Sequence, residues 1–160
     1  PQPLRVSPEG LLLTGGRIHA TPYVPIPGIG AAAAYADEEA FGTRFSFDVP
    51  KSGLIQAALA LDDDDENITV DLLLFSSAPT TGTDNSAYAP SEADLLRLEG
   101  VVNLGVRYGV SGATIGYNPG LAIPYTAPEG RLWVQAVARG ALNIAAGKSY
   151  KVALRILGDE

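Results

Sequence analysis

Apolar and polar residues alternate along most of the chain from residue 41 onward, and this pattern predicts β-strands. Phe45, Phe47 and Val49 are separated by single polar residues, which is the period expected of a strand with one buried face. The alternation recurs at 54–61, 68–75, 102–108, 132–138 and 150–156. Turn-forming residues separate these segments, and Asn-Pro-Gly at 118–120 is a strong turn signal. We expect about eight or nine strands in one all-β domain, as a β-sandwich, jelly roll or small barrel.

The predicted strand at 54–61 differs between its two faces. Strict alternation places Ile55, Ala57, Leu59 and Leu61 on one face, and Gln56, Ala58 and Ala60 on the other. The first face therefore points toward the core. The small alanines on the second face indicate that this face is covered as well.

Two short connections are predicted to form hairpins. Gly15 and Gly16 separate the apolar segments 11–14 and 17–20 and could form a two-residue turn. Residues 139–149 separate the last two predicted strands and are short enough for a longer hairpin loop.

Residues 67–99 join a strand, a polar loop and a short predicted helix. Ser91 is the expected N-cap, and Asp94 three residues later completes a short-acid version of the capping box. The apolar side of this helix is formed by Leu95, Leu96 and Leu98. Because a helix near 91–99 is too short to be stable alone in water, we expect these leucines to dock on the sheet.

Residues 1–30 are rich in Pro and Gly, which predicts an extended arm ahead of a single β-domain at 31–160. Proline lacks a backbone donor and fixes φ, so little of this segment suits a central strand. The arm still carries apolar side chains, which need to be buried somewhere. We therefore expect it to pack against another subunit or its own domain through Leu4, Val6, Leu11, Leu12, Leu13, Tyr23 and Ile26.

The charge balance argues against two kinds of partner. The chain has 11 Lys and Arg against 18 Asp and Glu, a net charge of −7, and its basic residues are scattered singly. Nucleic acids and anionic membrane surfaces both require clustered basic residues, so we expect neither as a partner. No apolar run approaches the roughly 20 residues that span a bilayer. The absence of Cys excludes disulfides and thiolate chemistry.

Candidate catalytic and metal-binding residues are few. His19 is the single histidine, and no Ser-His-Asp or Cys-His arrangement can be built on it. The acidic run at 62–66 could form a solvated turn, a Ca²⁺ site or a charged patch that meets a basic partner. It lacks the alternating ligands and central Gly of an EF-hand loop, which favours the solvated turn. We expect no enzyme, no catalytic residue, no metal site and no cofactor.

Several short motifs follow one another along the chain. They are Tyr-Ala-Asp at 35–37 followed by Gly42 and Phe45, Leu-Leu-Leu-Phe at 72–75, Thr-Asp-Asn at 83–85, Ser-Glu-Ala-Asp-Leu at 91–95 and Ile-Leu-Gly-Asp at 156–159. In this order, over about 35–159, they resemble the virion structural proteins of tailed bacteriophages, most of all capsid decoration proteins. The resemblance implies a homotrimer on a β-sandwich-like or tulip-like barrel. It also implies a location on the capsid surface and the major capsid protein as the partner.

Two classes of function remain open from the sequence. The first is a non-enzymatic viral structural protein that binds and stabilises the capsid surface as an oligomer. The alternative is a carbohydrate- or Ca²⁺-dependent β-sandwich binding module of a secreted or tail-fibre protein. A Ca²⁺- or glycan-dependent rise in melting temperature would distinguish the second class from the first.

Overall fold

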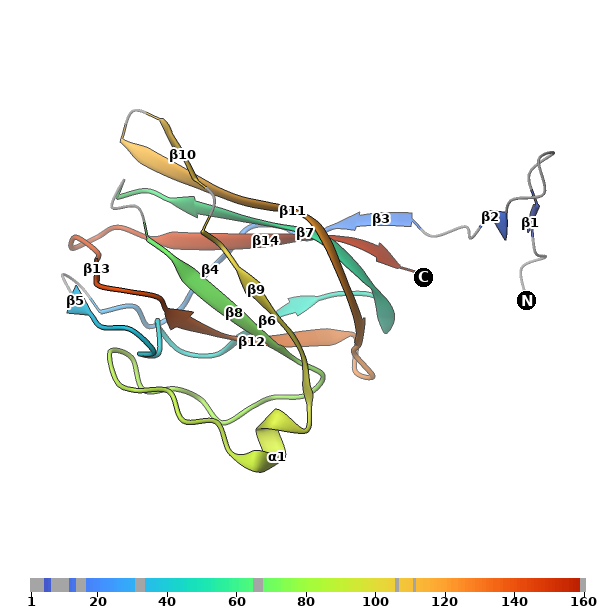
Figure 1. Cartoon of the computed structure of the whole chain (residues 1–160), viewed down its shortest axis with the longest axis horizontal. Coiled ribbons are helices and arrows are strands. Elements are labelled where there is room, and N and C mark those ends of the chain that lie inside the picture. The colour runs from blue at the N-terminus through green and yellow to red at the C-terminus, as the bar shows by residue number, and fades with distance from the viewer. Residues whose placement is uncertain are drawn as a thin grey trace.

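The computed structural model describes residues 5–6, 12–13, 17–30, 34–64, 68–105, 107–110 and 112–158. Within them lie fourteen strands and one short helix, and nine of the strands are four residues or longer. This confirms the predicted all-β class with one short helix. Figure 1 shows the strands arranged in two larger sheets that lie one over the other.

The larger sheet, called the long sheet below, is antiparallel and has six strands. Its order is β10 (Arg107–Val110), β11 (Ala113–Thr126), β7 (Ser52–Asp62), β14 (Tyr150–Gly158) and β3 (Arg17–Ala20). The short strand β4 (Val24–Pro25) also pairs with β14.

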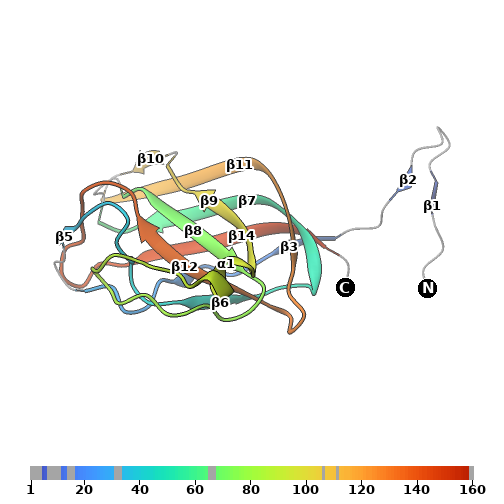
Figure 2. The ribbon, with the colours of Figure 1, turned by 60° about the horizontal axis from the view of Figure 1, so that its bottom comes forward.

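The second sheet has four antiparallel strands. Its order is β6 (Phe45–Asp48), β12 (Arg131–Ala138), β8 (Val70–Phe75) and β9 (Leu98–Asn103). Two further pairs are small: β1 (Arg5–Val6) with β2 (Leu12–Leu13), and β5 (Ala34–Tyr35) with β13 (Leu142–Asn143). Figures 1 and 2 both show β1 and β2 set apart from the two larger sheets.

The core lies between the two larger sheets. Strands β7 and β14 contribute Ile55, Val152 and Leu154, while β8 and β12 contribute alternate apolar residues from the opposite side. At one end, the Phe41 ring packs edge-to-face on Tyr35 and Tyr150, with ring centroids 5.0 and 5.5 Å apart. Burial of this apolar surface supplies the main driving force for folding.

The two sheets approach each other along β9 and the free edge of β11. Glu99 on β9 accepts hydrogen bonds from the backbone N–H and hydroxyl of Thr126, at 3.1 and 2.9 Å. Gly100 allows this approach, because a Cβ there would lie 2.7 Å from Cγ2 of Ile123. The sheets therefore close on one side like half of a barrel.

The strong turn signal at 118–120 is wrong as a turn. These residues lie inside β11, which continues from Ala113 to Thr126. The pairing of β11 with β7 shifts between Pro119 and Ile123, and Gly120 has a φ of +72°. The Pro and Gly are accommodated by this irregularity in the part of β11 that lies beyond its pairing with β10, where no second paired strand needs the missing donor.

Both predicted hairpins are also wrong. Strand β2 pairs with β1, whereas β3 pairs with β14. Residues 139–149 join β12 in the second sheet to β14 in the long sheet, so they cross between the sheets. A short connection forms a hairpin only when the two strands that it joins pair with each other in one sheet.

Part of the predicted N-terminal arm packs against its own domain. Strands β3 and β4 are hydrogen-bonded to β14, so residues 17–20 and 24–25 belong to the long sheet. Ile26 is 5% exposed and belongs to the core, while Tyr23 is 43% exposed. Leu4 and Leu11 lie outside the described residues. For Val6, Leu12 and Leu13 only the backbone is described, in β1 and β2.

Candidate functional site

The loop at 76–91 packs over the outer side of the second sheet and is held there by Asp84. The carboxylate of Asp84 accepts hydrogen bonds from the hydroxyl of Tyr35 at 2.9 Å and from the backbone N–H groups of Gly42 and Gly30 at 2.7 and 2.9 Å. Burial, together with the hydrogen bond to Asp84, raises the pKa of Tyr35 above its ordinary value. Asp84 therefore links the loop at 76–91 to Gly30, Tyr35 and Gly42.

Gln135 fastens the same loop from beneath. Its side chain is fully buried and accepts a hydrogen bond from the backbone N–H of Gly82 at 3.0 Å. Its amide nitrogen donates to the carbonyls of Gly42 and Ala136 at 3.3 and 3.0 Å. A Cβ at residue 82 would lie 2.5 Å from the Cβ of Ala40, so Gly82 permits this close packing. Periodicity alone did not single out this buried amide.

The helix α1 (Glu92–Leu95) begins with the predicted capping box. Ser91 Oγ accepts from the Asp94 backbone N–H at 3.1 Å, and Asp94 Oδ2 accepts from the Ser91 backbone N–H at 3.0 Å. Asp94 Oδ1 also accepts from the backbone N–H of Thr80 at 3.1 Å. The hydrogen bonds from Ser91, and then those from Thr80, outweigh partial burial and lower the pKa of Asp94 to about 2.

The predicted docking of the helix leucines is wrong. The helix ends at Leu95, and the backbone re-enters a strand at Leu98. The side chains of Leu95 and Leu96 are 50% and 82% exposed. We call these two residues the leucine tip. The capping box and the hydrogen bonds to Thr80 stabilise the short helix in place of an apolar contact with the sheet.

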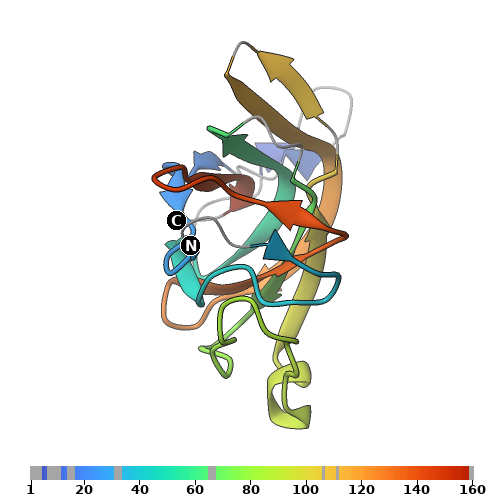
Figure 3. The same cartoon turned by 90° about the vertical axis from the view of Figure 1, so that its left-hand side faces the viewer.

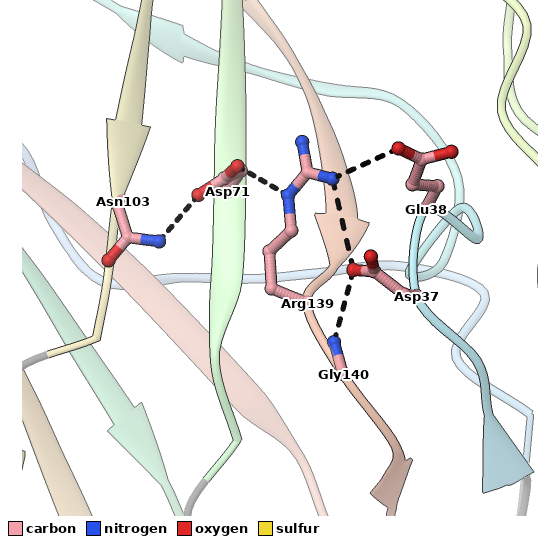
Figure 4. Close-up of polar contacts among 6 residues, drawn as sticks. All are labelled: Asp37, Glu38, Asp71, Asn103, Arg139 and Gly140. Carbon is pink, nitrogen blue, oxygen red and sulfur yellow. Dashed lines mark hydrogen bonds and ion pairs between the residues drawn. The ribbon is translucent and has the colours of Figure 1, made fainter.

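A second polar cluster surrounds Arg139, as Figure 4 shows. Its Nε lies 2.6 Å from Asp71 Oδ2, and its Nη1 lies 3.8 Å from carboxylate oxygens of both Asp37 and Glu38. Asn103 donates to the other oxygen of Asp71 at 2.7 Å. The hydrogen bond to Asp71, with the three nearby negative charges, raises the pKa of Arg139. This cluster therefore links β8 and β9 to Arg139, which follows β12, and through Arg139 to Asp37 and Glu38.

The described part of the acidic run is also structural. Asp63 accepts hydrogen bonds from the backbone N–H and hydroxyl of Ser149, and Asp64 accepts from the backbone N–H of Ala145. Burial raises the pKa of Asp63, but these hydrogen bonds and the nearby Lys148 and Lys151 outweigh it and lower the pKa. Asp65 and Glu66 lie outside the described residues. Residues 62–64 therefore fasten the segment that leads into β14.

No arrangement for metal binding occurs among the described residues, where no group of three or more His, Cys, Asp or Glu could hold an ion. His19 lies exposed on β3 at the edge of the long sheet, opposite Ile156. In that same described part of the chain, no helix is long and apolar enough to cross a membrane.

The long sheet has an apolar face turned away from the core. Its residues are Leu54, Ala57, Leu59 and Leu61 on β7, Lys151, Ala153, Arg155 and Leu157 on β14, Ile115, Tyr117, Pro119 and Pro124 on β11, Tyr108 on β10, and Ile18 and Ala20 on β3. We call this surface the outer face. Ile18 and Tyr108, at its two sides, are 71% and 61% exposed, and Leu59 and Leu61 between them are partly exposed.

The exposure of Leu59 and Leu61 reverses a prediction. Ala58 and Ala60 lie in the core, and the larger leucines point outward. The pairing of β7 with β14 shifts between Ala57 and Ile55, which leaves Gln56 as one extra residue on β7. Such a bulge exchanges the two faces of a strand on one side of it. Alternation read straight through residue 56 therefore assigns the wrong face.

Comparison with known proteins does not identify relatives. No protein-family profile matches the chain, and no curated protein or solved structure is significantly similar to it. The geometry of the described residues therefore carries the functional argument.

Proposed function

We propose that the protein is a non-enzymatic structural module that assembles with itself and binds the surface of a larger protein shell. The observation that carries this proposal is the outer face, an apolar surface on which Ile18, Tyr108 and Tyr117 are exposed and Leu59 and Leu61 are partly exposed. Exposed apolar patches of this kind on a soluble domain are typical of protein–protein contact sites.

The polar clusters support a structural role. Asp84, Asp94 and Asp71 each accept hydrogen bonds that join segments distant in sequence, and Asp63 does the same at the start of β14. A general acid or base needs a carboxyl group that can exchange protons with a substrate near neutral pH. The lowered pKa values of Asp94 and Asp63 suit permanent acceptors of hydrogen bonds.

The specific proposal is a capsid decoration protein that works as a trimer on the major capsid protein. The motifs between Tyr35 and Asp159 that resemble such proteins support it. A ligand that binds the assembled shell, but not its dissociated parts, stabilises the shell by mass action. Three linked copies also raise the effective concentration at each site, so weak individual contacts suffice.

The position of the short strands β1 and β2 supports a part for them in binding. They pair with each other and stand apart from the two larger sheets in both Figures 1 and 2. Two paired strands set apart from the larger sheets can reach a neighbouring chain, which is the role proposed for residues 1–13.

On this proposal a major capsid protein is encoded in the same genome, and co-sedimentation with capsids assembled from it tests the proposal. We expect the full chain to sediment with intact capsids and to raise their melting temperature. Deletion of residues 1–13 should reduce binding while leaving the melting temperature of the free domain unchanged. If the full chain neither sediments with capsids nor stabilises them at saturating concentration, the proposed function is wrong.

A further inference from the structure

The leucine tip and the outer face are the two prominent apolar features left open by the described residues. Leu96 is the most exposed large apolar side chain among them, at 82%. On the outer face, the cross-strand row Pro124, Leu54, Leu157 and Ile18 is apolar throughout. In the described part of the chain, Leu95 and Leu96 of the tip and Ile18, Tyr108 and Tyr117 of the outer face are exposed, whereas Ala57 and Ala153 within the outer face are buried.

The two surfaces lie on opposite sides of the molecule. Gln135 points away from the core and is covered by Gly82, so the loop that leads to α1 packs on the outer side of the second sheet. The outer face belongs to the other sheet and points the opposite way. Figures 1 and 3 accordingly show α1 and β10 at opposite ends of the domain. A contact between the tip and the middle of the outer face therefore requires two copies of the chain.

Glu92 beside the leucine tip is opposite in charge to the basic residues of the outer face, although exposed Arg97 also flanks the tip. The outer face carries two basic residues, Lys151 and Arg155, and none of its residues is acidic, although the chain has a net charge of −7. On α1, exposed Glu92 precedes Leu96 by four residues and so lies on the same side of the helix. Two outer faces brought together would instead oppose like charges, which disfavours a symmetric face-to-face dimer.

The dimensions suit a small inserted element better than a flat contact. With strands about 4.8 Å apart and about 3.3 Å per residue, the outer face measures roughly 20 Å in each direction. The corresponding area, about 400 Å², is smaller than the roughly 800 Å² that each partner buries in a typical specific interface. A projecting apolar tip needs only a small surface to bind. Closure of a ring then repeats the same contact in every subunit.

We propose that the leucine tip of one copy docks on the outer face of the next, with Glu92 facing Lys151 and Arg155. This is a heterologous, head-to-tail contact, which closes into a ring when the rotation between copies permits. The proposal rests on the self-assembly in the proposed function and specifies the surfaces that perform it.

Complementation between two variants tests the contact. Leu96→Glu removes the tip and leaves the outer face intact, while Tyr117→Glu places a charge on the outer face and leaves the tip intact. Both substituted residues are exposed, so circular dichroism and melting temperature should match those of the parent chain. By multi-angle light scattering, we expect each variant alone to have the mass of one chain. An equimolar mixture should form a dimer of twice that mass and nothing larger.

Charge exchange supplies a second readout. Glu92→Arg and Arg155→Glu should each weaken assembly at least tenfold, and the two changes together in one chain should restore it. Arg131→Glu is the matched control, because Arg131 is exposed on β12 and belongs to neither surface. This control should leave assembly unchanged.

Three results would overturn the inference: Leu96→Glu retaining the parent mass, the mixed variants remaining monomeric, or the double charge exchange failing to restore assembly. If Tyr117→Glu unfolds, Tyr117→Ser gives the same test without placing a charge on the sheet. A parent chain that is itself monomeric would refute the self-assembly in the proposed function. An assembled parent with unaffected variants refutes only this choice of surfaces.

Discussion

At the scale of single residues, Asp94 should make stability depend on acid pH. Its pKa is lowered to about 2 in the folded chain, against about 3.9 when unfolded. A lowered carboxyl pKa stabilises the folded state above the unfolded value, and that contribution is lost as the pH falls from about 4 to 2. In Asp94→Asn this titration is absent. We expect the melting temperature of the variant to lie below that of the parent at pH 6 and to converge on it near pH 2.

Thermal unfolding followed by circular dichroism between pH 2 and 7 measures this difference. The other carboxyl groups titrate in both proteins, so their contribution cancels in the comparison. A difference in melting temperature that stays constant across the range would contradict the role of Asp94 as an ionised cap.

Two leucines provide a contrast between core and surface. Leu74 on β8 is fully buried, while Leu96 is 82% exposed. Leu74→Ala should lower the free energy of unfolding by about 2–5 kcal/mol, because it leaves a cavity between the sheets. Leu96→Ala should change it by no more than about 0.5 kcal/mol. Urea denaturation at a concentration where the chain is monomeric measures both. A loss at Leu96 similar to that at Leu74 would show that the tip is packed rather than free.

At the scale of elements, the loop at 76–91 depends on Asp84. Asp84→Ala leaves the backbone N–H groups of Gly30 and Gly42 and the hydroxyl of Tyr35 without their acceptor. Unsatisfied buried groups cost about 1–3 kcal/mol, so we expect a loss of that size and faster amide exchange at Gly42. Hydrogen exchange measured by NMR resolves this site.

Asp48→Ala is the matched control for the Asp84 substitution. Asp48 forms an exposed ion pair with Arg131 at 3.6 Å, and exposed pairs of this kind contribute about 0–1 kcal/mol. Equal effects of the two substitutions would mean that Asp84 contributes no more than a surface charge.

Much of the fold could be predicted from local signals. Strands at 45–48, 70–75 and 131–138 follow the alternation, because each has one face in the core. The capping box formed by Ser91 and Asp94 was predicted because its partners are three residues apart. Signals of this kind depend only on neighbouring residues, so the sequence shows them directly.

Non-local features could not be predicted in the same way. The bulge at Gln56 depends on how β7 pairs with β14, about a hundred residues later. This bulge decides whether Leu59 points into the core or away from it. Gln135 and Gly82 form a site only when the loop folds over the second sheet. The exposure of Leu96 depends on hydrogen bonds that hold α1 without apolar docking. In each case, tertiary pairing rather than local pattern sets the outcome.

At the scale of the whole molecule, the acids and the apolar surfaces are segregated. The acidic groups with described contacts hold loops at the ends and on the second sheet, while the outer face of the long sheet carries only basic and uncharged residues. The net charge of −7 favours solubility of a monomer, whereas the exposed apolar residues of the outer face lower that solubility. Assembly that covers the outer face would account for both properties.

The molar mass in solution tests this assembly most directly. Multi-angle light scattering across a hundredfold range of concentration should give a mass that is a whole multiple of the 16.6 kDa chain, three times that mass for the proposed trimer, with dissociation only at the lowest concentrations. A mass of one chain at every concentration would contradict assembly through the outer face.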